Sequence, residues 1–228
     1  MDVSWKVEKI PIFEDNFVFV IHNGTDAIIV DPGEDSAVLK FLEKYELRCQ
    51  MIFITHHHAD HVQGVQKIKN LFSCPVYGPL KNKHQLIDLC THWVKEGDKI
   101  NFLDLHFTVF ECPGHTLGHL AFWCLDKLWL FSGDVVFSLG CGRLFEGSFE
   151  QMFLTLKRIN SLPDLTLIYC THDYYPANQR FCSQEKISLD GYQSVHPLIL
   201  RQEKKYNPFF KATTVQEFQS VREKRNHF

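Results

Sequence analysis

Residues 51–64 read MIFITHHHADHVQG, an apolar run followed by four histidines and one aspartate within six positions. A short continuous apolar run is typical of a strand that is buried on both faces. The alternative interpretation is a solvated histidine patch, but such patches usually have polar flanks. Because apolar residues lead directly into this one, the stretch predicts a metal site at the end of a buried strand.

The spacing within this stretch assigns different roles to its members. Alternate side chains at a strand end point the same way. His56 and His58 can therefore converge, and His57 is a spacer that points elsewhere. Asp60 and His61 follow at the start of the next turn or helix. One loop can thus present two imidazoles to one ion and a carboxylate with an imidazole to another.

Three further candidate ligands follow apolar runs elsewhere in the chain. His115 lies in CPGHTLGH, where Gly114 permits a tight turn and His119 is the less favoured ligand. Asp134 ends the run LFSGD, and His172 ends LIYCTH. Each residue alone has a plausible structural role, but their joint occurrence at strand ends predicts one shared site, because loops at a sheet edge gather functional groups.

The candidate ligands suffice for two metal ions per chain. The expected sets are His56, His58 and His115 for one ion; Asp60, His61 and His172 for the other; and Asp134 as a bridge. Imidazole and carboxylate ligands suit Zn, Fe or Mn, and zinc is the first expectation. Water shared by two cations is strongly acidified, so we expect hydrolysis by a metal-bound hydroxide that Asp60 orients as the catalytic residue.

Composition limits the other classes of function. The chain has 228 residues, 45% of them apolar, and a net charge of −3, which provides no strong field for nucleic acid or anionic membranes. No apolar run approaches about 18 residues, and the N-terminus has no secretory signal pattern. The eight dispersed cysteines read as reduced thiols. We therefore expect a cytoplasmic monomer without membrane or nucleic-acid partners.

The chain changes character near residues 172–175. Before this point, apolar runs alternate with segments of helical periodicity, as in NFVFVIHNGTDAIIV, which predicts a hairpin, and DSAVLKFLEKYEL, which predicts a helix. Ser148 is the predicted N-cap of a later helix. After residues 172–175, the share of charged residues and helix formers increases. The boundary predicts a catalytic domain at 1–172 and a small helical domain at 173–228.

Four motifs together identify a family resemblance. THHHADH, PGHTLGH, SGD and THDY resemble the metallo-β-lactamase superfamily, and the resemblance runs through residues 12–172. It implies an α/β fold, the αββα sandwich of two packed sheets with helices outside. It also implies a dinuclear metal site at one sheet edge.

Other segments narrow the resemblance. DNFVFVI, GCGRLFEGSFEQM, YNPF and the ending REKRNHF are similar to the hydroxyacylglutathione hydrolase (glyoxalase II) family. The implied reaction is hydrolysis of S-(2-hydroxyacyl)glutathione thioesters, typically S-D-lactoylglutathione, to glutathione and a 2-hydroxy acid. In that family this is a step of methylglyoxal detoxification. The resemblance then covers nearly the whole chain, and the helical domain is implied to bind substrate.

The same resemblance implies the substrate contacts. Glutathione carries two carboxylates, which arginine binds well. Arg143, Arg222 and Arg225 match basic glutathione-binding positions of the family, and Tyr174 matches a tyrosine that hydrogen-bonds glutathione. Phe145 stands where the family often has tyrosine.

Two alternatives remain open at this point. One is a glutathione persulfide dioxygenase of the same superfamily, which uses a single iron ion. The other is a metal-binding protein without catalytic activity. The complete set of seven ligands and the glutathione-binding ending favour the thioester hydrolase.

Overall fold

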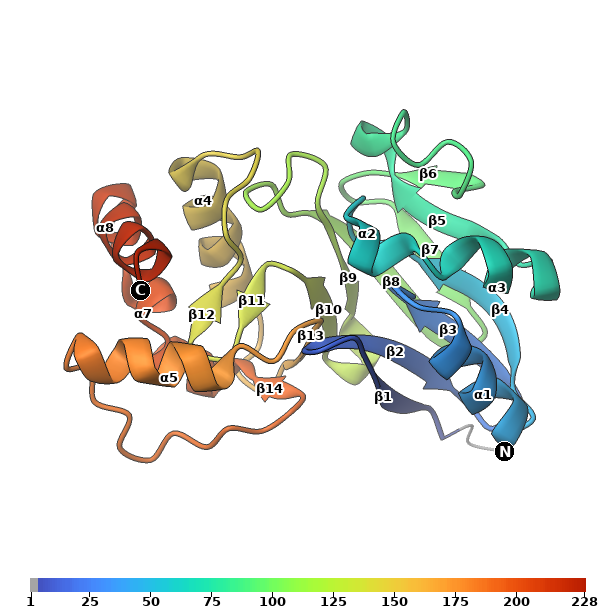
Figure 1. Cartoon of the computed structure of the whole chain (residues 1–228), viewed down its shortest axis with the longest axis horizontal. Coiled ribbons are helices and arrows are strands. Elements are labelled where there is room, and N and C mark those ends of the chain that lie inside the picture. The colour runs from blue at the N-terminus through green and yellow to red at the C-terminus, as the bar shows by residue number, and fades with distance from the viewer. Residues whose placement is uncertain (1–3) are drawn as a thin grey trace. The chain divides into compact units, whose positions relative to one another are not determined.

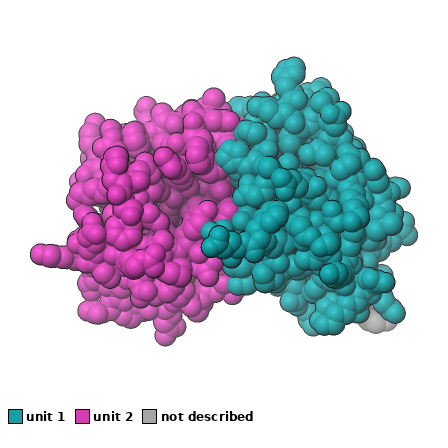
Figure 2. Space-filling model, in the orientation of Figure 1, with its two compact units in different colours: residues 1–96 teal, residues 97–228 magenta. Residues whose placement is uncertain are grey.

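The structure is a computed structural model that describes residues 4–228. The first three residues of the predicted 1–172 domain therefore lie outside the described residues. The chain divides into two compact units, Met1–Glu96 and Gly97–Phe228, which Figure 2 colours separately. Among the described residues, no helix is both long and apolar enough to cross a bilayer.

Unit 1 is built on one mixed sheet with helices. Its elements are β1 (Lys6–Ile12), β2 (Asn16–His22), β3 (Asp26–Val30), α1 (Ser36–Lys44), β4 (Arg48–Phe53), α2 (Ala59–Val62), α3 (Val65–Phe72), β5 (Val76–Pro79), the 3-10 turn η1 (Leu80–Asn82) and β6 (His92–Val94). The strands lie in sequence order. Strands β1 to β3 pair antiparallel, and β3 to β6 pair parallel.

The sheet of unit 1 packs against helices α1 and α3 (Figure 1). Val18 and Val20 of β2 share a buried cluster with Val38 of α1 and Ile68 of α3. The alternation along β2 sends every second side chain into this cluster. The predicted hairpin and helix are both present, and β4 is buried where it approaches the histidine stretch.

Unit 2 holds the second sheet. Its elements are β7 (Lys99–Phe102), β8 (Leu105–Glu111), β9 (Leu120–Cys124), η2 (Leu125–Lys127), β10 (Trp129–Gly133), β11 (Val136–Phe137), β12 (Gly140–Cys141), α4 (Phe149–Asn160), β13 (Leu167–Cys170), α5 (Tyr175–Gln184), β14 (Leu198–Ile199), α6 (Leu200–Tyr206), α7 (Pro208–Lys211) and α8 (Val215–Asn226). The strand order is β14-β13-β10-β9-β8-β7, and β11 and β12 form a separate pair.

Helix α4 covers this second sheet. Met152 and Leu156 of α4 share a buried cluster with Ile168 of β13 and Phe218 of α8. The predicted cap is confirmed: the Ser148 hydroxyl accepts from the Gln151 N–H, and the Gln151 side chain accepts from the Ser148 N–H. This capping box satisfies two backbone donors of the first turn.

The C-terminal segment is mostly helical, as expected, but it also contributes a strand. β14 pairs antiparallel with β13, Leu167 opposite Ile199 and Ile168 opposite Leu198. The predicted boundary near residue 172 falls inside unit 2. The assignment of 173–228 as a separate substrate-binding domain stays a prediction.

Candidate metal centre and substrate site

The candidate residues of the histidine stretch lie at the carboxyl end of β4. His56 is buried, and His58 is the residue that precedes α2 in an extended conformation. Asp60 and His61 occupy the first turn of α2, as the spacing predicts. The turn between strand and helix therefore presents four candidate ligands over a short length of backbone.

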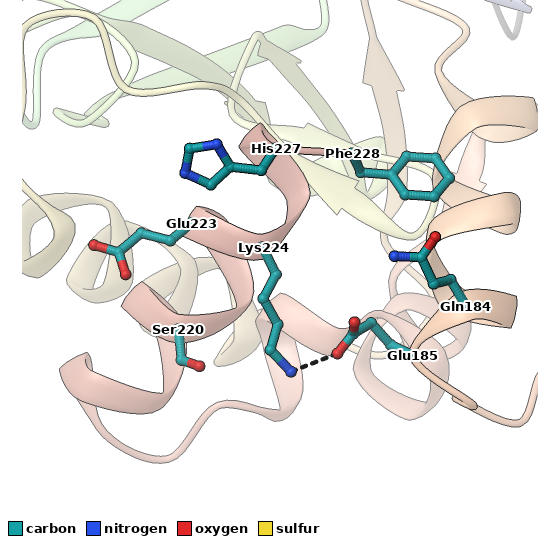
Figure 3. Close-up of a pocket in the computed structure, with 7 residues that line it drawn as sticks. All are labelled: Gln184, Glu185, Ser220, Glu223, Lys224, His227 and Phe228. Carbon is teal, nitrogen blue, oxygen red and sulfur yellow. Dashed lines mark hydrogen bonds and ion pairs between the residues drawn. The ribbon is translucent and has the colours of Figure 1, made fainter.

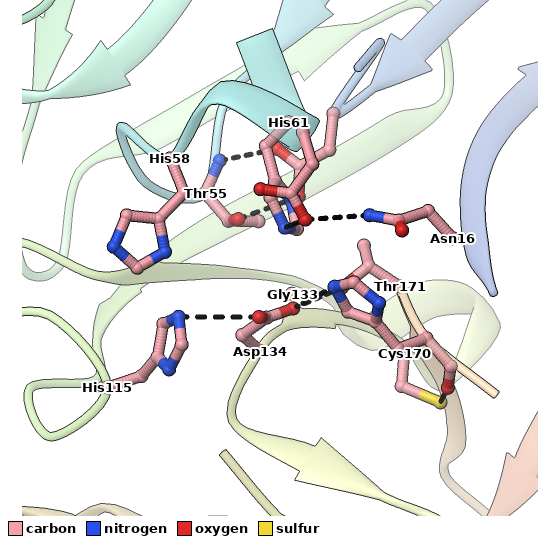
Figure 4. A network of polar contacts seen from close by, with 12 residues as sticks. Asn16, Thr55, His58, His61, His115, Gly133, Asp134, Cys170 and Thr171 are labelled. Atoms are coloured by element: carbon pink, nitrogen blue, oxygen red, sulfur yellow. Dashed lines mark hydrogen bonds and ion pairs between the residues drawn. The ribbon is translucent and has the colours of Figure 1, made fainter. Parts of the chain in front are cut away.

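Within unit 1, these side chains converge in two pairs. His56 Nε2 lies 3.0 Å from His58 Nδ1, so two ring nitrogens point to one place. His61 Nε2 lies 3.5 Å from Asp60 Oδ2. Figure 4 shows His58 and His61 among the polar contacts of this region. Both pairs bring together atoms that can coordinate a cation.

Asp31, the residue that follows β3, organises the histidines of this loop. Its carboxylate accepts from the Thr55 N–H at 2.8 Å, from the Thr55 hydroxyl at 2.7 Å and from His61 Nδ1 at 3.0 Å. The Thr55 oxygen in turn accepts from His56 Nδ1 at 3.0 Å. Both rings therefore carry their proton on Nδ1, and both leave the Nε2 lone pair for a metal ion.

Asn16 holds the candidate catalytic carboxylate. Its Nδ2 donates to Asp60 Oδ2 at 2.8 Å (Figure 4), and Asn16 itself is buried at the start of β2. A carboxylate on the first turn of a short helix has freedom about its side-chain torsions. The amide contact removes part of this freedom and directs one oxygen of Asp60.

Within unit 2, Asp134 lies between two imidazoles. His115 Nε2 is 3.3 Å from Asp134 Oδ2, and His172 Nε2 is 3.4 Å from Asp134 Oδ1. Figure 4 shows His115 pointing toward Asp134. All three residues are buried. A carboxylate whose two oxygens face different imidazoles has the arrangement of a ligand that bridges two cations.

Neighbouring groups fix the orientation of this trio. Thr171 Oγ1 donates to Asp134 Oδ1 at 2.6 Å, and the Asp134 N–H donates to His119 Nε2 at 3.1 Å. His115 Nδ1 donates to the Arg143 carbonyl at 2.7 Å, so its Nε2 is the unprotonated nitrogen. His119, the less favoured ligand, thus supports the backbone of Asp134.

The donor set fits divalent metal ions. The seven residues offer imidazole nitrogens and carboxylate oxygens without a thiolate. His56, His61 and His115 each use Nδ1 in a hydrogen bond. A metal-ligating histidine typically donates its second ring N–H in this way. The side chains are therefore prepared to coordinate rather than to carry a positive charge.

The candidate substrate residues of unit 2 differ in their surroundings. Arg143 is exposed, and its guanidinium lies 5.7 Å from the centre of the Phe145 ring. Phe145 is exposed and meets His115 edge-on at 5.2 Å. The Tyr174 ring stacks on His172 at 4.9 Å. These residues place a cation and aromatic surface beside two of the candidate ligands.

Arg222 and Arg225 project from α8 into a positively charged region. Arg222 Nη1 donates to the Cys141 carbonyl at 2.8 Å, and its buried Nε has no hydrogen-bond partner among the described residues. Arg225 Nε donates to Asn178 Oδ1 at 2.8 Å. Burial, and then the charges of Arg222 and Arg180, lower the pKa of Arg225. Crowded cations with spare donors favour an anionic ligand.

A cavity of about 520 Å³ lies between the ends of α5 and α8 (Figure 3). It is lined by Gln184, Glu185, Ser220, Glu223, Lys224, His227 and Phe228. Lys224 and Glu185 form an ion pair there. The lining includes none of the candidate ligands or substrate residues.

Comparison with known proteins identifies the family. A sequence profile described as the Metallo-beta-lactamase superfamily matches residues 12–172. A hydroxyacylglutathione hydrolase of Bdellovibrio bacteriovorus is 44% identical over 96% of this chain and 97% of its own length. The chain belongs to the hydroxyacylglutathione hydrolase family of the metallo-β-lactamase superfamily. The predicted family is therefore confirmed.

Solved structures agree on the fold of this metallo-β-lactamase superfamily member. The BLEG-1 B3 metallo-beta-lactamase superposes with a TM-score of 0.76 at 24% identity, covering 91% of this chain and 100% of that one. ETHE1 from Myxococcus xanthus gives 0.75 at 24% identity, with coverages of 96% and 90%. The predicted α/β sandwich fold is confirmed, and the family with its His/Asp groups implies divalent metal ions.

Several supporting residues were not assigned from the sequence. The structure pairs Asp31 with His61. Asn16, Thr171 and His119 were not predicted as supports. The local signal for Thr171 and His119 was their position, because each lies close in sequence to a candidate ligand. Asn16, at the start of β2, lies 44 residues before Asp60, so no local pattern marks it.

Proposed function

We propose that this chain hydrolyses S-(2-hydroxyacyl)glutathione thioesters, typically S-D-lactoylglutathione, to glutathione and a 2-hydroxy acid. The observation that carries the proposal is the Asp134 carboxylate, whose two oxygens each face a buried imidazole. Divalent ions held by these residues would suit hydrolysis of an acyl compound. Membership of the hydroxyacylglutathione hydrolase family supports the thioester as substrate.

The proposed ligands are divided into two sets with a shared member. His56, His58 and His115 would hold one ion; Asp60, His61 and His172 would hold the second; and Asp134 would contribute to both. Zinc is the proposed metal, with iron and manganese as alternatives that accept the same ligands. Bound divalent ions would polarise the thioester carbonyl and acidify a water molecule at neutral pH.

The remaining steps belong to side chains of this chain. Asp60, directed by Asn16, accepts a proton from the attacking water and orients it toward the carbonyl carbon. Arg143, Arg222 and Arg225 bind the carboxylates of the glutathione moiety, and Tyr174 donates to it. The cysteine sulfur of glutathione then leaves as a thiolate, and the C–S bond of the thioester is replaced by a C–O bond.

The proposed setting is the cytoplasm, and the proposed state is a monomer. All eight cysteines are free and buried. Burial raises the pKa of the Cys90 thiol to about 12 and that of Cys182 to about 11, which keeps both unreactive. Free thiols in this number are typical of a reducing compartment, where glutathione is also abundant.

Metal removal and reconstitution test the proposal. The protein with its native metal is expected to remove the thioester absorbance of S-D-lactoylglutathione with saturation kinetics. A chelator should abolish this turnover, and zinc, iron or manganese added singly should restore it, with two ions bound per chain at full activity. Oxygen uptake on glutathione persulfide by the same protein, without thioester turnover, would instead identify a persulfide dioxygenase.

A further inference from the structure

The hairpin β11–β12 contains a turn that needs outside support. Val136 pairs with Cys141 and Phe137 with Gly140, so only Ser138 and Leu139 form the turn. Leu139 has φ +57°, in the left-handed region that glycine or asparagine normally occupies. This conformation is unfavourable for an L-residue with a side chain. Something in the surrounding structure must therefore hold Leu139 in place.

Side chains of the C-terminal segment provide that support. Asn207 Nδ2 donates to the Phe137 carbonyl at 3.3 Å and to the Gly140 carbonyl at 2.9 Å. The Leu139 N–H donates to Glu203 Oε2 at 2.9 Å. Asn178 Nδ2 donates to the Ser138 carbonyl at 2.9 Å, and Arg222 Nη1 donates to the Cys141 carbonyl at 2.8 Å. Each hairpin residue from 137 to 141 thus has a backbone group bonded to a side chain that comes from residues 178–222.

Glu203 and Asn207 form the centre of this support. Glu203 is 1% exposed and Asn207 is fully buried. Asn207 Nδ2 also donates to Glu203 Oε2 at 2.9 Å, and the Tyr192 hydroxyl donates to Glu203 Oε1 at 2.8 Å. Tyr192 further bonds the Ser138 hydroxyl at 2.6 Å. A buried carboxyl group is costly unless it is hydrogen-bonded in this way.

The hairpin connects three groups of the proposed centre. It begins two residues after Asp134 and ends two residues before Arg143. The Arg143 carbonyl accepts the Nδ1 proton of His115. At Gly142, an added Cβ would lie 1.9 Å from the Asp134 carbonyl oxygen, so the two ends of the hairpin are in close backbone contact. A displacement of the hairpin would therefore move Asp134, Arg143 and the partner of His115 together.

We propose that Glu203 and Asn207 are positioning residues for the reaction, which act by holding the 137–141 hairpin and, through it, Asp134, His115 and Arg143. This inference rests on the proposed function for its catalytic consequence. It assigns to the C-terminal segment a task beyond contact with glutathione. The segment acts through hairpin carbonyls that lie 67 and 70 residues before Asn207 in the sequence.

The variants are chosen to separate positioning from simple stabilisation. Asn207→Ala and Glu203→Ala remove the two central side chains. Glu203→Gln keeps an oxygen for the Leu139 N–H and can donate to the Tyr192 hydroxyl, so it serves as the conservative rescue. Glu223→Ala on α8 is the matched control, because its carboxylate is exposed and bonds only Gln219 among the hydrogen bonds described here.

Three measurements are made on full-length folded protein. Hydrogen–deuterium exchange of the peptide spanning 135–143 reports the hairpin, competition with a chelator reports zinc affinity, and steady-state thioester hydrolysis reports kcat and KM. Near-UV circular dichroism selects variants that are folded at the assay temperature. If Glu203→Ala does not fold, Tyr192→Phe, which removes one donor to Glu203, replaces it.

The proposal predicts coordinated losses in Asn207→Ala and Glu203→Ala. Exchange in 135–143 should accelerate, the zinc dissociation constant should rise about tenfold, and KM should rise with the displacement of Arg143. Glu203→Gln should recover most of each loss, and Glu223→Ala should resemble the wild type. Folded variants with wild-type exchange and zinc affinity would overturn the proposal. Absence of thioester turnover in the wild type would contradict the proposed function alone, since exchange and zinc affinity still test the positioning.

Discussion

Asp31 and His61 form a buried pair in which the carboxylate Oδ2 lies 3.0 Å from the imidazole Nδ1, with side-chain exposures of 0% and 1%. The same carboxylate binds the backbone and hydroxyl of Thr55, whose oxygen accepts from His56. One residue thus sets the tautomer of two proposed ligands. Asp31 also adopts φ +50°, so the backbone is held in a strained conformation at this position.

Replacement of Asp31 should therefore weaken metal binding. In Asp31→Asn, one carboxylate oxygen is replaced by an NH2 group, which can face His61 Nδ1–H in place of an acceptor. The Nε2 lone pairs of His56 and His61 are then less well directed. We expect the metal dissociation constant to rise about 10- to 100-fold. Chelator competition measures this value. Asp35→Asn is the control, because Asp35 pairs with Lys67 at the surface, and an equal effect of both variants would contradict the role of Asp31.

Asn16 should affect turnover more than substrate binding. Its amide directs the Asp60 carboxylate, so Asn16→Ala should lower kcat about tenfold with little change in KM. Asn70→Ala on the exposed surface of α3 provides the comparison, since Asn70 bonds only Gln66 among the hydrogen bonds described here. Steady-state kinetics with S-D-lactoylglutathione separates the two constants. A rise in KM at constant kcat would place Asn16 in substrate binding instead.

The arginine cluster should act on KM. Arg225→Met removes a charged donor, and we expect KM for the glutathione thioester to rise about tenfold. Lys224→Met lies next to it in sequence but removes a cation that pairs with Glu185 at the surface, and its KM should stay near that of the wild type. Equal effects of the two variants on KM would indicate non-specific electrostatic attraction of the substrate rather than a binding site at Arg225.

The buried Glu203 makes stability depend on pH. Burial raises the pKa of Glu203 in the folded chain above its usual value near 4.3. The usual value applies to Glu203 in the unfolded chain. As pH rises between the unfolded-state and folded-state pKa values, Glu203 ionises in the unfolded chain first, so the wild type loses stability. Its facing groups Tyr192, Cys170 and Cys182 all have raised pKa values and stay neutral.

The Glu203→Gln variant cannot ionise at this position, so its stability should lack this loss. Urea unfolding of both proteins from pH 4 upward measures the difference. As pH rises, the free energy of unfolding of the wild type should fall relative to that of the variant. Above the pKa of Glu203 in the folded chain, the difference between the two proteins should stay constant. A difference that is independent of pH would show that Glu203 keeps its ordinary pKa.

The capping box at Ser148 should affect stability without affecting catalysis. Ser148→Ala leaves an N–H of the first turn of α4 without its side-chain acceptor, at a cost of about 1 kcal/mol. For a chain of this size, the melting temperature should fall by about 2–4 °C. Ser183→Ala, at an exposed position of α5, should leave the melting temperature unchanged. Thermal unfolding of the metal-loaded proteins provides the comparison, and kcat/KM should be unaffected in both.

The sequence was most informative where one local pattern determines the structure. The buried strand β4, the hairpin of β2 and β3 and the Ser148 cap follow from apolar periodicity and turn or cap residues that are adjacent in the chain. The spacing in the histidine stretch also places Asp60 and His61 on the first turn of α2. These features depend on short-range backbone geometry.

The supporting contacts could not be predicted because they join distant residues. Asp31 meets His61 across 30 residues, and Glu203 meets Leu139 across 64. Strand β14 in the C-terminal segment likewise depends on a partner elsewhere in the sequence, because it forms by pairing with β13. No local propensity encodes such pairs, since they depend on packing of the completed sheet. The family resemblance supplied the thioester and the arginines, which composition alone does not indicate.

If the histidine stretch holds metal for thioester hydrolysis, two adjacent histidines must differ in their effect on turnover. Steady-state turnover of S-D-lactoylglutathione is measured with zinc-loaded wild type, His58→Ala and His57→Ala. We expect His58→Ala to abolish turnover and His57→Ala, at the spacer position, to retain it. Retained turnover in His58→Ala, or equal loss in both variants, would show that the stretch does not hold the catalytic metal in this way.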